Sequence, residues 1–229
     1  MLTFFELSAA DNDVRFSPFV WRIKLMLAHK GVAYESKTIT FADKTALEGS
    51  GLSTVPVVRD GDEWINESLM IAKWLEEKYP ENPLFEGPAA KIQAGLISNW
   101  IDRNIVMPLF PMIVSDVFAG LDEESKLKFR ESREPRLGGK KIEDTRAGRE
   151  AAREAFQANL APVEAILEKN KFLSGDAPGF ADYCLMGTFM WAYVVTDFDP
   201  ILGDGPVAAW RERMFDLFDG MPRKAKRAV

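Results

Sequence analysis

The chain has very little of the residues that build disulfides and metal sites. Its 229 residues include one cysteine, Cys184, and one histidine, His29. One cysteine cannot form an internal disulfide, and the absence of a Cys-x-x-Cys pair excludes a dithiol oxidoreductase. So few ligands predict no zinc or other metal site. We expect Cys184, in the apolar run YCLMGTFMW, to be inert packing, and His29 to be a surface residue at a helix end.

Long apolar runs and basic stripes are also missing. No stretch reaches the length that spans a membrane, and residues 1–16 lack the pattern of a secretory signal. The net charge of −6 argues against nucleic acid as a partner. The one basic cluster, residues 223–227, is interpreted as a solvated terminus. We therefore expect a cytoplasmic protein, and the 47% hydrophobic content is sufficient for a substantial core.

The first half of the chain alternates strand and helix patterns. Residues 2–7 and 34–39 read as strands, and between them Ser17-Pro18 begins a helix, because serine caps well and proline suits the first helical position. Asp60-Gly61 predicts a tight hairpin. A second helix opens at Glu67-Ser68 and ends before Pro80. The order βαβ followed by ββα predicts a thioredoxin-like α/β domain.

The second half is dominated by helical periodicity. Long helices are predicted over residues 92–117, with a kink at Pro108 and Pro111, and over 142–169, 181–195 and 206–218. The charged run 123–136 is interpreted as a solvated segment or as a lid. The predicted organisation is an α/β domain over residues 1–80, a linker over 81–88 and an all-α domain over 89–229.

Residues 53–79 carry the strongest chemical signal. Val55 precedes Pro56, and a cis bond there would turn the N–H and C=O of Val55 outward, where an extended peptide could pair with them. Ser68, at a helix start, offers a hydroxyl and free N–H groups to a carboxylate, and Glu67 could neutralise an amine. Glutathione is a ligand that needs all of these groups. The alternative is a plain hairpin followed by a helix with Ser68 as its N-cap.

Ser17 is the candidate catalytic residue. Partial positive charge at a helix start favours a thiolate, and the Ser17 hydroxyl could donate a hydrogen bond to the sulfur of glutathione. Alternatively Ser17 only caps the first helix, and both roles are compatible.

The TVPVV, NES and FADY segments, together with the two-domain layout, resemble the cytosolic glutathione transferases over nearly the whole chain. SPFVWRIKLMLAHKG and LGGKKIEDTRAGRE resemble more narrowly the bacterial β-aryl etherase branch, which cleaves lignin-type ethers with glutathione. A departure is Gly179, where many transferases place a hydroxyl cap, at an expected cost of a few tenths of a kcal/mol.

The resemblance implies glutathione as co-substrate, held by Val55, Pro56, Glu67 and Ser68, with Ser17 stabilising its thiolate. It also implies attack on a hydrophobic, aromatic electrophile, and a homodimer. Six residues could line the acceptor pocket or be ordinary core: Phe16, Phe19, Trp100, Met107, Phe110 and Trp191. The rival functions are a non-catalytic carrier of aromatic compounds and a glutathione-dependent isomerase.

Overall fold

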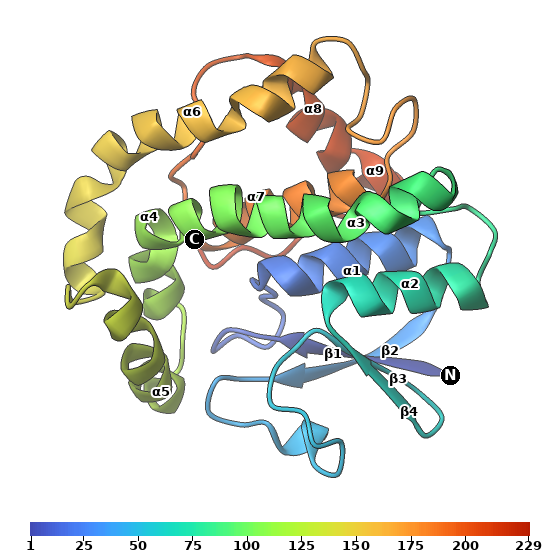
Figure 1. The fold of residues 1–229 in the computed structure, drawn as a ribbon. Coiled ribbons are helices and arrows are strands. Elements are labelled where there is room, and N and C mark those ends of the chain that lie inside the picture. Colours follow the sequence, from blue (N-terminus) through green and yellow to red (C-terminus); the bar gives the residue numbers. More distant parts are fainter.

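The structure is a computed structural model and describes residues 1–229. Its N-terminal part is a four-stranded sheet in the order β2-β1-β3-β4. β1 (Leu2–Leu7) runs parallel to β2 (Tyr34–Ile39) and antiparallel to β3 (Val57–Asp60), which pairs antiparallel with β4 (Glu63–Asn66). Helices α1 (Pro18–His29) and α2 (Ser68–Lys78) cover the sheet face that meets the C-terminal helices (Figure 1). The thioredoxin-like prediction is confirmed.

Local sequence signals explain these elements. Ser17 has extended backbone angles (φ −63°, ψ 126°), and its Oγ accepts a hydrogen bond from the Val20 N–H, as an N-cap should. Pro18 follows at the first helical position. Between β3 and β4, Gly61 has φ +59°, the left-handed angle that a tight hairpin turn requires.

The C-terminal part is helical. The predicted long helix is interrupted, but before the prolines: a π-helical segment, Asp102–Val106, separates α3 (Gly87–Ile101) from α4 (Met107–Ala119), which continues through Pro111. The charged run that was interpreted as a solvated segment or lid folds as α5 (Glu123–Arg133), which buries Phe129. The remaining elements are η1 (Thr45–Leu47) in the first half, then η3 (Glu134–Leu137), η4 (Glu143–Gly148), α6 (Arg149–Leu167), α7 (Phe180–Val195), α8 (Pro206–Phe215) and α9 (Leu217–Gly220).

Helix α7 is the centre of the molecule and packs against α1. Nearly all its side chains are buried, as its apolar sequence predicts, and Cys184 is fully enclosed. Burial raises the pKa of the Cys184 thiol to about 12, which makes it inert. From α1, buried Arg22 donates to the Cys184 carbonyl (3.2 Å) and pairs with Asp102 (2.5 Å). No helix of the protein is both long and apolar enough to span a bilayer.

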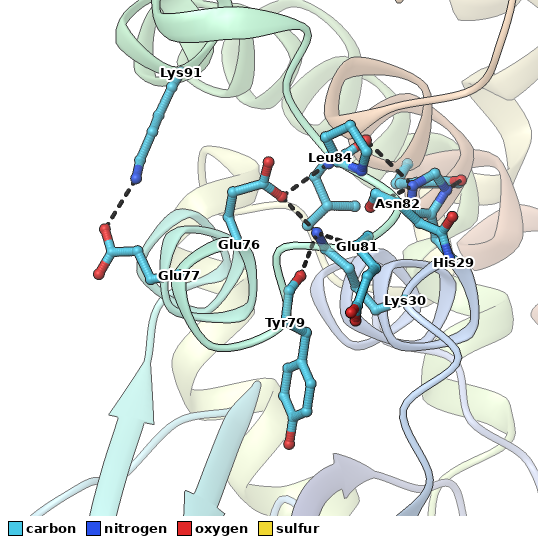
Figure 2. Close-up of polar contacts among 11 residues, drawn as sticks. His29, Lys30, Glu76, Glu77, Tyr79, Glu81, Asn82, Leu84 and Lys91 are labelled. Atoms are coloured by element: carbon cyan, nitrogen blue, oxygen red, sulfur yellow. Dashed lines mark hydrogen bonds and ion pairs between the residues drawn. The ribbon is translucent and has the colours of Figure 1, made fainter.

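The segment that joins α2 to α3 is clamped by a buried lysine. The Lys30 side chain is fully enclosed and donates to Glu76 Oε2 (2.7 Å) and to the Tyr79 and Glu81 carbonyls (2.8 and 3.2 Å), as Figure 2 shows. Glu76 also accepts from the Leu84 N–H (2.9 Å). Because the buried charge is both paired and hydrogen-bonded, the segment has a defined path between the two halves.

His29 is half-buried and both of its ring nitrogens have hydrogen-bond partners, so its prediction as a surface residue is wrong. Its Nε2 lies 3.0 Å from the Asn82 carbonyl, which can only accept, so Nε2 carries the proton. Nδ1 then accepts from the Tyr183 hydroxyl at 2.7 Å. Burial lowers the pKa of His29, which keeps the ring neutral. One side chain thus joins α1, the linker and α7.

The space at Gly179 is filled by a neighbour. A Cβ at this position would lie 2.7 Å from Ser174 Oγ and 3.0 Å from the Leu84 carbonyl oxygen. The Asp182 carboxylate makes half of a capping box, since it accepts from the Gly179 N–H (3.1 Å) as well as from Ser174 N–H and Trp210 Nε1. Glycine here is therefore a steric requirement rather than a missing cap.

The basic C-terminal residues are docked on the protein, which corrects their interpretation as a solvated terminus. Arg227 donates to the carbonyls of Tyr193 (2.7 Å) and Thr196 (2.9 Å), at the end of α7. Lys226 pairs with Asp11 in the loop between β1 and α1 (2.6 Å). The chain end lies between α4 and α7 in Figure 1. The sequence signal was misleading because these partners are far away in sequence.

Candidate functional site

The predicted site residues meet at one end of the sheet. Phe5 of β1 pairs with Val57 of β3, and Val57 pairs with Asn66 of β4. The end of β1, the start of β3 and the end of β4 therefore lie side by side. Three short connections extend from this edge: Val55-Pro56 before β3, Glu67-Ser68 after β4, and the loop that leads from β1 to Ser17. Topology brings these segments together although they are up to 51 residues apart.

Val55 offers an unpaired backbone at this edge. The Val55–Pro56 peptide bond is cis. Val55 is half-buried and Pro56 is buried, so the segment is held in place. The backbone hydrogen bonds outside helices and strands include none from the Val55 N–H or to its C=O. A half-buried donor and acceptor with no partner match an extended peptide added as a further strand.

Helix α2 starts without a side-chain cap. Its N-cap is Glu67, not Ser68, so the alternative of Ser68 as a plain N-cap is wrong: Ser68 is the first helical residue. Glu67 is exposed and has φ +65°, ψ 125°, a conformation that costs a residue with a side chain about 1–3 kcal/mol. Such strain is concentrated at functional sites. The uncapped N–H groups and helix dipole form a site suited to a carboxylate.

Ser17 does cap α1, but weakly. Its Oγ is 3.4 Å from the Val20 nitrogen, and the residue is 5% exposed. The hydroxyl accepts in that contact, which leaves its own proton free to donate. An uncommitted hydroxyl at a helix start can stabilise a thiolate.

Helix α7, which carries the acceptor candidate Trp191, packs against the start of α1. Gly187 of α7 is so close to Pro18 that a Cβ would lie 2.5 Å from its carbonyl oxygen. Trp191 is one turn further along the same face of α7, and its ring stacks on Phe110 of α4 at 6.1 Å. The Trp191 Nε1–H is buried without a hydrogen-bond partner.

The six acceptor candidates have different surroundings. Phe16 is buried and stacks on Phe41 instead. Met107 and Phe110 line a pocket of about 360 Å³ between α4 and the η3–η4 segment, which includes neither Ser17 nor Val55 among its walls. Phe19 and Trp100 are half-buried against the core.

Lys44 was not identified from the sequence. Its Nζ donates to the carbonyl of Ser53 at 2.7 Å. Ser53 lies two residues before Val55, so this exposed cation is held close to the Val55 segment. A lone lysine in a loop gives no signal by itself, because its importance depends on the fold of residues 40–54.

Two family models match this chain. The glutathione S-transferase N-terminal domain matches residues 13–83, and the glutathione S-transferase C-terminal domain matches residues 93–213, which is more than half of the chain. The chain belongs to the glutathione S-transferase family. As a glutathione S-transferase family member, it carries Ser17, Val55, Pro56, Glu67 and Ser68 within the matched N-terminal region.

Several relatives of this glutathione S-transferase family member are known. Glutathione S-transferase DHAR3, chloroplastic, of Arabidopsis thaliana is 33% identical over 93 residues, 39% of this chain and 36% of that protein. Maleylacetoacetate isomerase of Dictyostelium discoideum is 27% identical over 175 residues, 72% of this chain and 70% of that protein. The matched part of the Arabidopsis relative is thus well under two thirds of its length.

Solved structures share the fold across the whole chain. Glutathione S-transferase CsGST63524 of Ceriporiopsis subvermispora, crystallised in complex with glutathione, has a TM-score of 0.76 at 24% identity and covers 98% of this chain and 94% of its own. Glutathione transferase GSTFuA3 of Phanerochaete chrysosporium has a TM-score of 0.75 at 26% identity, with coverage of 96% and 92%.

Proposed function

We propose that the protein is a glutathione transferase that activates the thiol of glutathione for attack on a hydrophobic, aromatic electrophile. The proposal assigns glutathione binding to residues 1–80, the linker to 81–88 and acceptor binding to 89–229. The observation that carries it is the juxtaposition of an unpaired Val55 backbone with the uncapped, strained start of α2. A two-ended peptide-like ligand would satisfy both.

Glutathione fits this edge in one direction. Its γ-glutamyl carboxylate binds Ser68 and the first N–H groups of α2, and Glu67 pairs with the adjacent amine. Its cysteinyl backbone pairs with Val55, alongside Pro56, as an added strand. The glycine carboxylate then lies toward Lys44, which is held near Val55 by its bond to Ser53.

The reaction requires a thiolate. Ser17 donates its hydroxyl proton as a hydrogen bond to the sulfur and, with the dipole of α1, favours loss of the thiol proton to solvent. The thiolate attacks the electrophilic carbon, a C–S bond forms, and the leaving group departs with the bonding electrons. In an aryl ether the leaving group is an aryloxide, which takes a proton from water.

The aromatic pair Phe110–Trp191 supports an aromatic acceptor. Trp191 lies one helical turn from Gly187, which packs against Pro18, and it offers an unpaired indole N–H. A buried donor without a partner is costly, and an ether or carbonyl oxygen of the acceptor would satisfy it. This arrangement supports ether cleavage as the specific activity within the proposal.

A product assay tests the proposal. Purified protein and glutathione are incubated with a model β-aryl ether, an activated aryl halide and an isothiocyanate, and products are identified by mass spectrometry. Phenol release with a glutathione thioether supports ether cleavage, and conjugation of the other electrophiles alone supports a transferase with a different acceptor. Glutathione binding without turnover of any compound would favour the carrier function over catalysis.

A glutathione-dependent isomerase is the second candidate, because one relative is a maleylacetoacetate isomerase. An isomerase would use the same glutathione site, formed by Ser17 and Val55. The sulfur of glutathione would add to the substrate, and the C–S bond would then break again. Changed substrate geometry without a stable conjugate would identify this reaction.

The proposal includes a cytoplasmic homodimer. Three apolar side chains on neighbouring helices are highly exposed: Met70 (54%) on α2, and Ile92 (82%) and Leu96 (73%) on α3. An apolar patch of this kind favours contact with a second copy. Sedimentation of the wild type against Ile92→Asp tests it: a dimer that the substitution dissociates supports the patch, and a monomeric wild type contradicts it.

A further inference from the structure

Residues 222–228, called here the C-terminal strap, cross the end of α7. Arg227 donates from Nε to the Tyr193 carbonyl (2.7 Å) and from Nη2 to the Thr196 carbonyl (2.9 Å), and it pairs with Asp197 (2.8 Å). The Ala228 N–H donates to the Val194 carbonyl at 2.7 Å. These carbonyls belong to the last turn of α7 or follow it, where they lack helical partners and favour a cation. The strap is therefore anchored as a C-terminal cap of α7.

The anchored strap carries Lys226 to the loop before Ser17. Lys226 Nζ is 2.6 Å from Asp11 and 3.5 Å from Asp13. The hydrogen bond from Lys226 is the main reason that the pKa of Asp11 lies below its usual range. Without the cation, two carboxylates two residues apart would repel each other at the tip of the loop.

A chain of hydrogen bonds connects Asp11 to the residues before Ser17. Asp11 accepts from the N–H groups of Asp13 (2.9 Å) and Val14 (3.0 Å), and Val14 in turn accepts from the Ala9 N–H (3.0 Å). An isolated bridge then joins Ser8 to Arg15, two residues before Ser17. These bonds close the loop on itself, and they connect Asp11 through Val14 and Ala9 to the Ser8–Arg15 bridge.

We propose that Lys226 is a positioning residue for the reaction: by holding Asp11 and Asp13, it fixes the loop that presents the Ser17 hydroxyl to the glutathione sulfur. The inference rests on the proposed function, since it assigns a role in thiol activation. It also explains why the basic terminus is docked across the molecule instead of extending into solvent.

Two substitutions and a matched control test the proposal. Lys226→Gln removes the cation, Lys226→Arg keeps it, and Lys224→Gln removes a neighbouring cation whose contact is with the Asp219 carbonyl near the strap. The measurements are kcat and KM for glutathione with an activated aryl halide, the pH dependence of kcat, and hydrogen exchange of residues 8–16.

For Lys226→Gln we expect faster exchange of the loop and a kcat about two- to five-fold lower, the range that exposed ion pairs give. The pH profile of kcat should shift upward, and KM for glutathione should stay unchanged because Val55 and Ser68 lie on other elements. Lys226→Arg should restore kcat, and Lys224→Gln should match the wild type. At about 1 M salt the wild type should approach the variant, because screening weakens exposed pairs.

Unchanged hydrogen exchange of the loop in Lys226→Gln would overturn the claim that the strap holds the loop. Faster exchange with an unchanged kcat would overturn the role of Lys226 in positioning Ser17. An equal loss of kcat in Lys224→Gln would also overturn it, since that change spares the loop. If the wild-type protein turns over no electrophile, the proposed function fails. Hydrogen exchange then still decides whether Lys226 holds the loop.

Discussion

Replacing Gly187 by alanine should push α7 against the start of α1. A Cβ at this position would lie 2.5 Å from the Pro18 carbonyl oxygen and 2.8 Å from Arg22 Cγ. Ordinary contact begins near 3.4 Å, so the Pro18 oxygen must withdraw by about 0.9 Å. Because Pro18 directly follows Ser17, the shift carries the Ser17 hydroxyl with it.

We expect this substitution to lower both stability and turnover. Overpacking costs about 1–3 kcal/mol, and the better helix propensity of alanine returns up to ~1 kcal/mol. With the full propensity gain the net loss is up to about 2 kcal/mol, which lowers the Tm of a chain of this size by up to roughly 8 °C. Displacing the hydroxyl by nearly 1 Å should reduce kcat by about tenfold or more. Calorimetry and steady-state kinetics measure the two effects.

Gly95→Ala is the matched control, because Gly95 is also inside a helix. The nearest atom to a Cβ there is Leu69 Cδ2 at 3.6 Å, an ordinary contact. This variant should be more stable than the wild type by up to ~1 kcal/mol, with unchanged kcat. A Gly187→Ala protein with wild-type Tm and kcat would refute the close approach of α7 to Ser17.

Three further substitutions test individual contacts. The folded-state pKa of His29 lies below its unfolded value of 6.5, so the wild type should lose stability as pH falls below about 6.5. Denaturant unfolding at pH 7.5 and 5.5 measures this loss. The free energy of unfolding of His29→Gln should fall less between the two pH values than that of the wild type, and an equal fall would contradict a lowered pKa for His29. Gly179→Ser should lower the Tm, because Ser174 fills the space, whereas a higher Tm would restore the missing-cap explanation. Glu67→Ala should raise KM for glutathione about tenfold by removing a charge-assisted hydrogen bond, and an unchanged KM would exclude Glu67 from the site.

The sequence predicted the elements whose causes are local. Residues 2–7 and 34–39 are strands as expected, and Ser17-Pro18 and Asp60-Gly61 form the helix start and turn that their chemistry favours. Neighbouring residues determine these features, so no knowledge of the fold is needed. The site could be assembled for the same reason: once the βαβ and ββα order is recognised, the three connections must share an edge.

What the sequence could not predict depends on distant partners. His29 bonds to Tyr183, 154 positions away, and Lys226 reaches Asp11 from the opposite end of the chain. Gly179 looked like a weak cap because the side chain that fills its space comes from Ser174. The sequence leaves Ser68 open as an N-cap, because only the backbone angles of Glu67 reveal which residue precedes the helix.

The most direct test of the proposed mechanism is to titrate the thiol of bound glutathione in the wild type and in Ser17→Ala, following thiolate absorbance against pH, with calorimetry for affinity. We expect Ser17→Ala to bind glutathione as the wild type does. Its bound thiol should return toward the ordinary pKa of about 8.5, and kcat should fall by about a hundredfold. A variant with the wild-type thiol pKa and kcat would remove Ser17 from the mechanism.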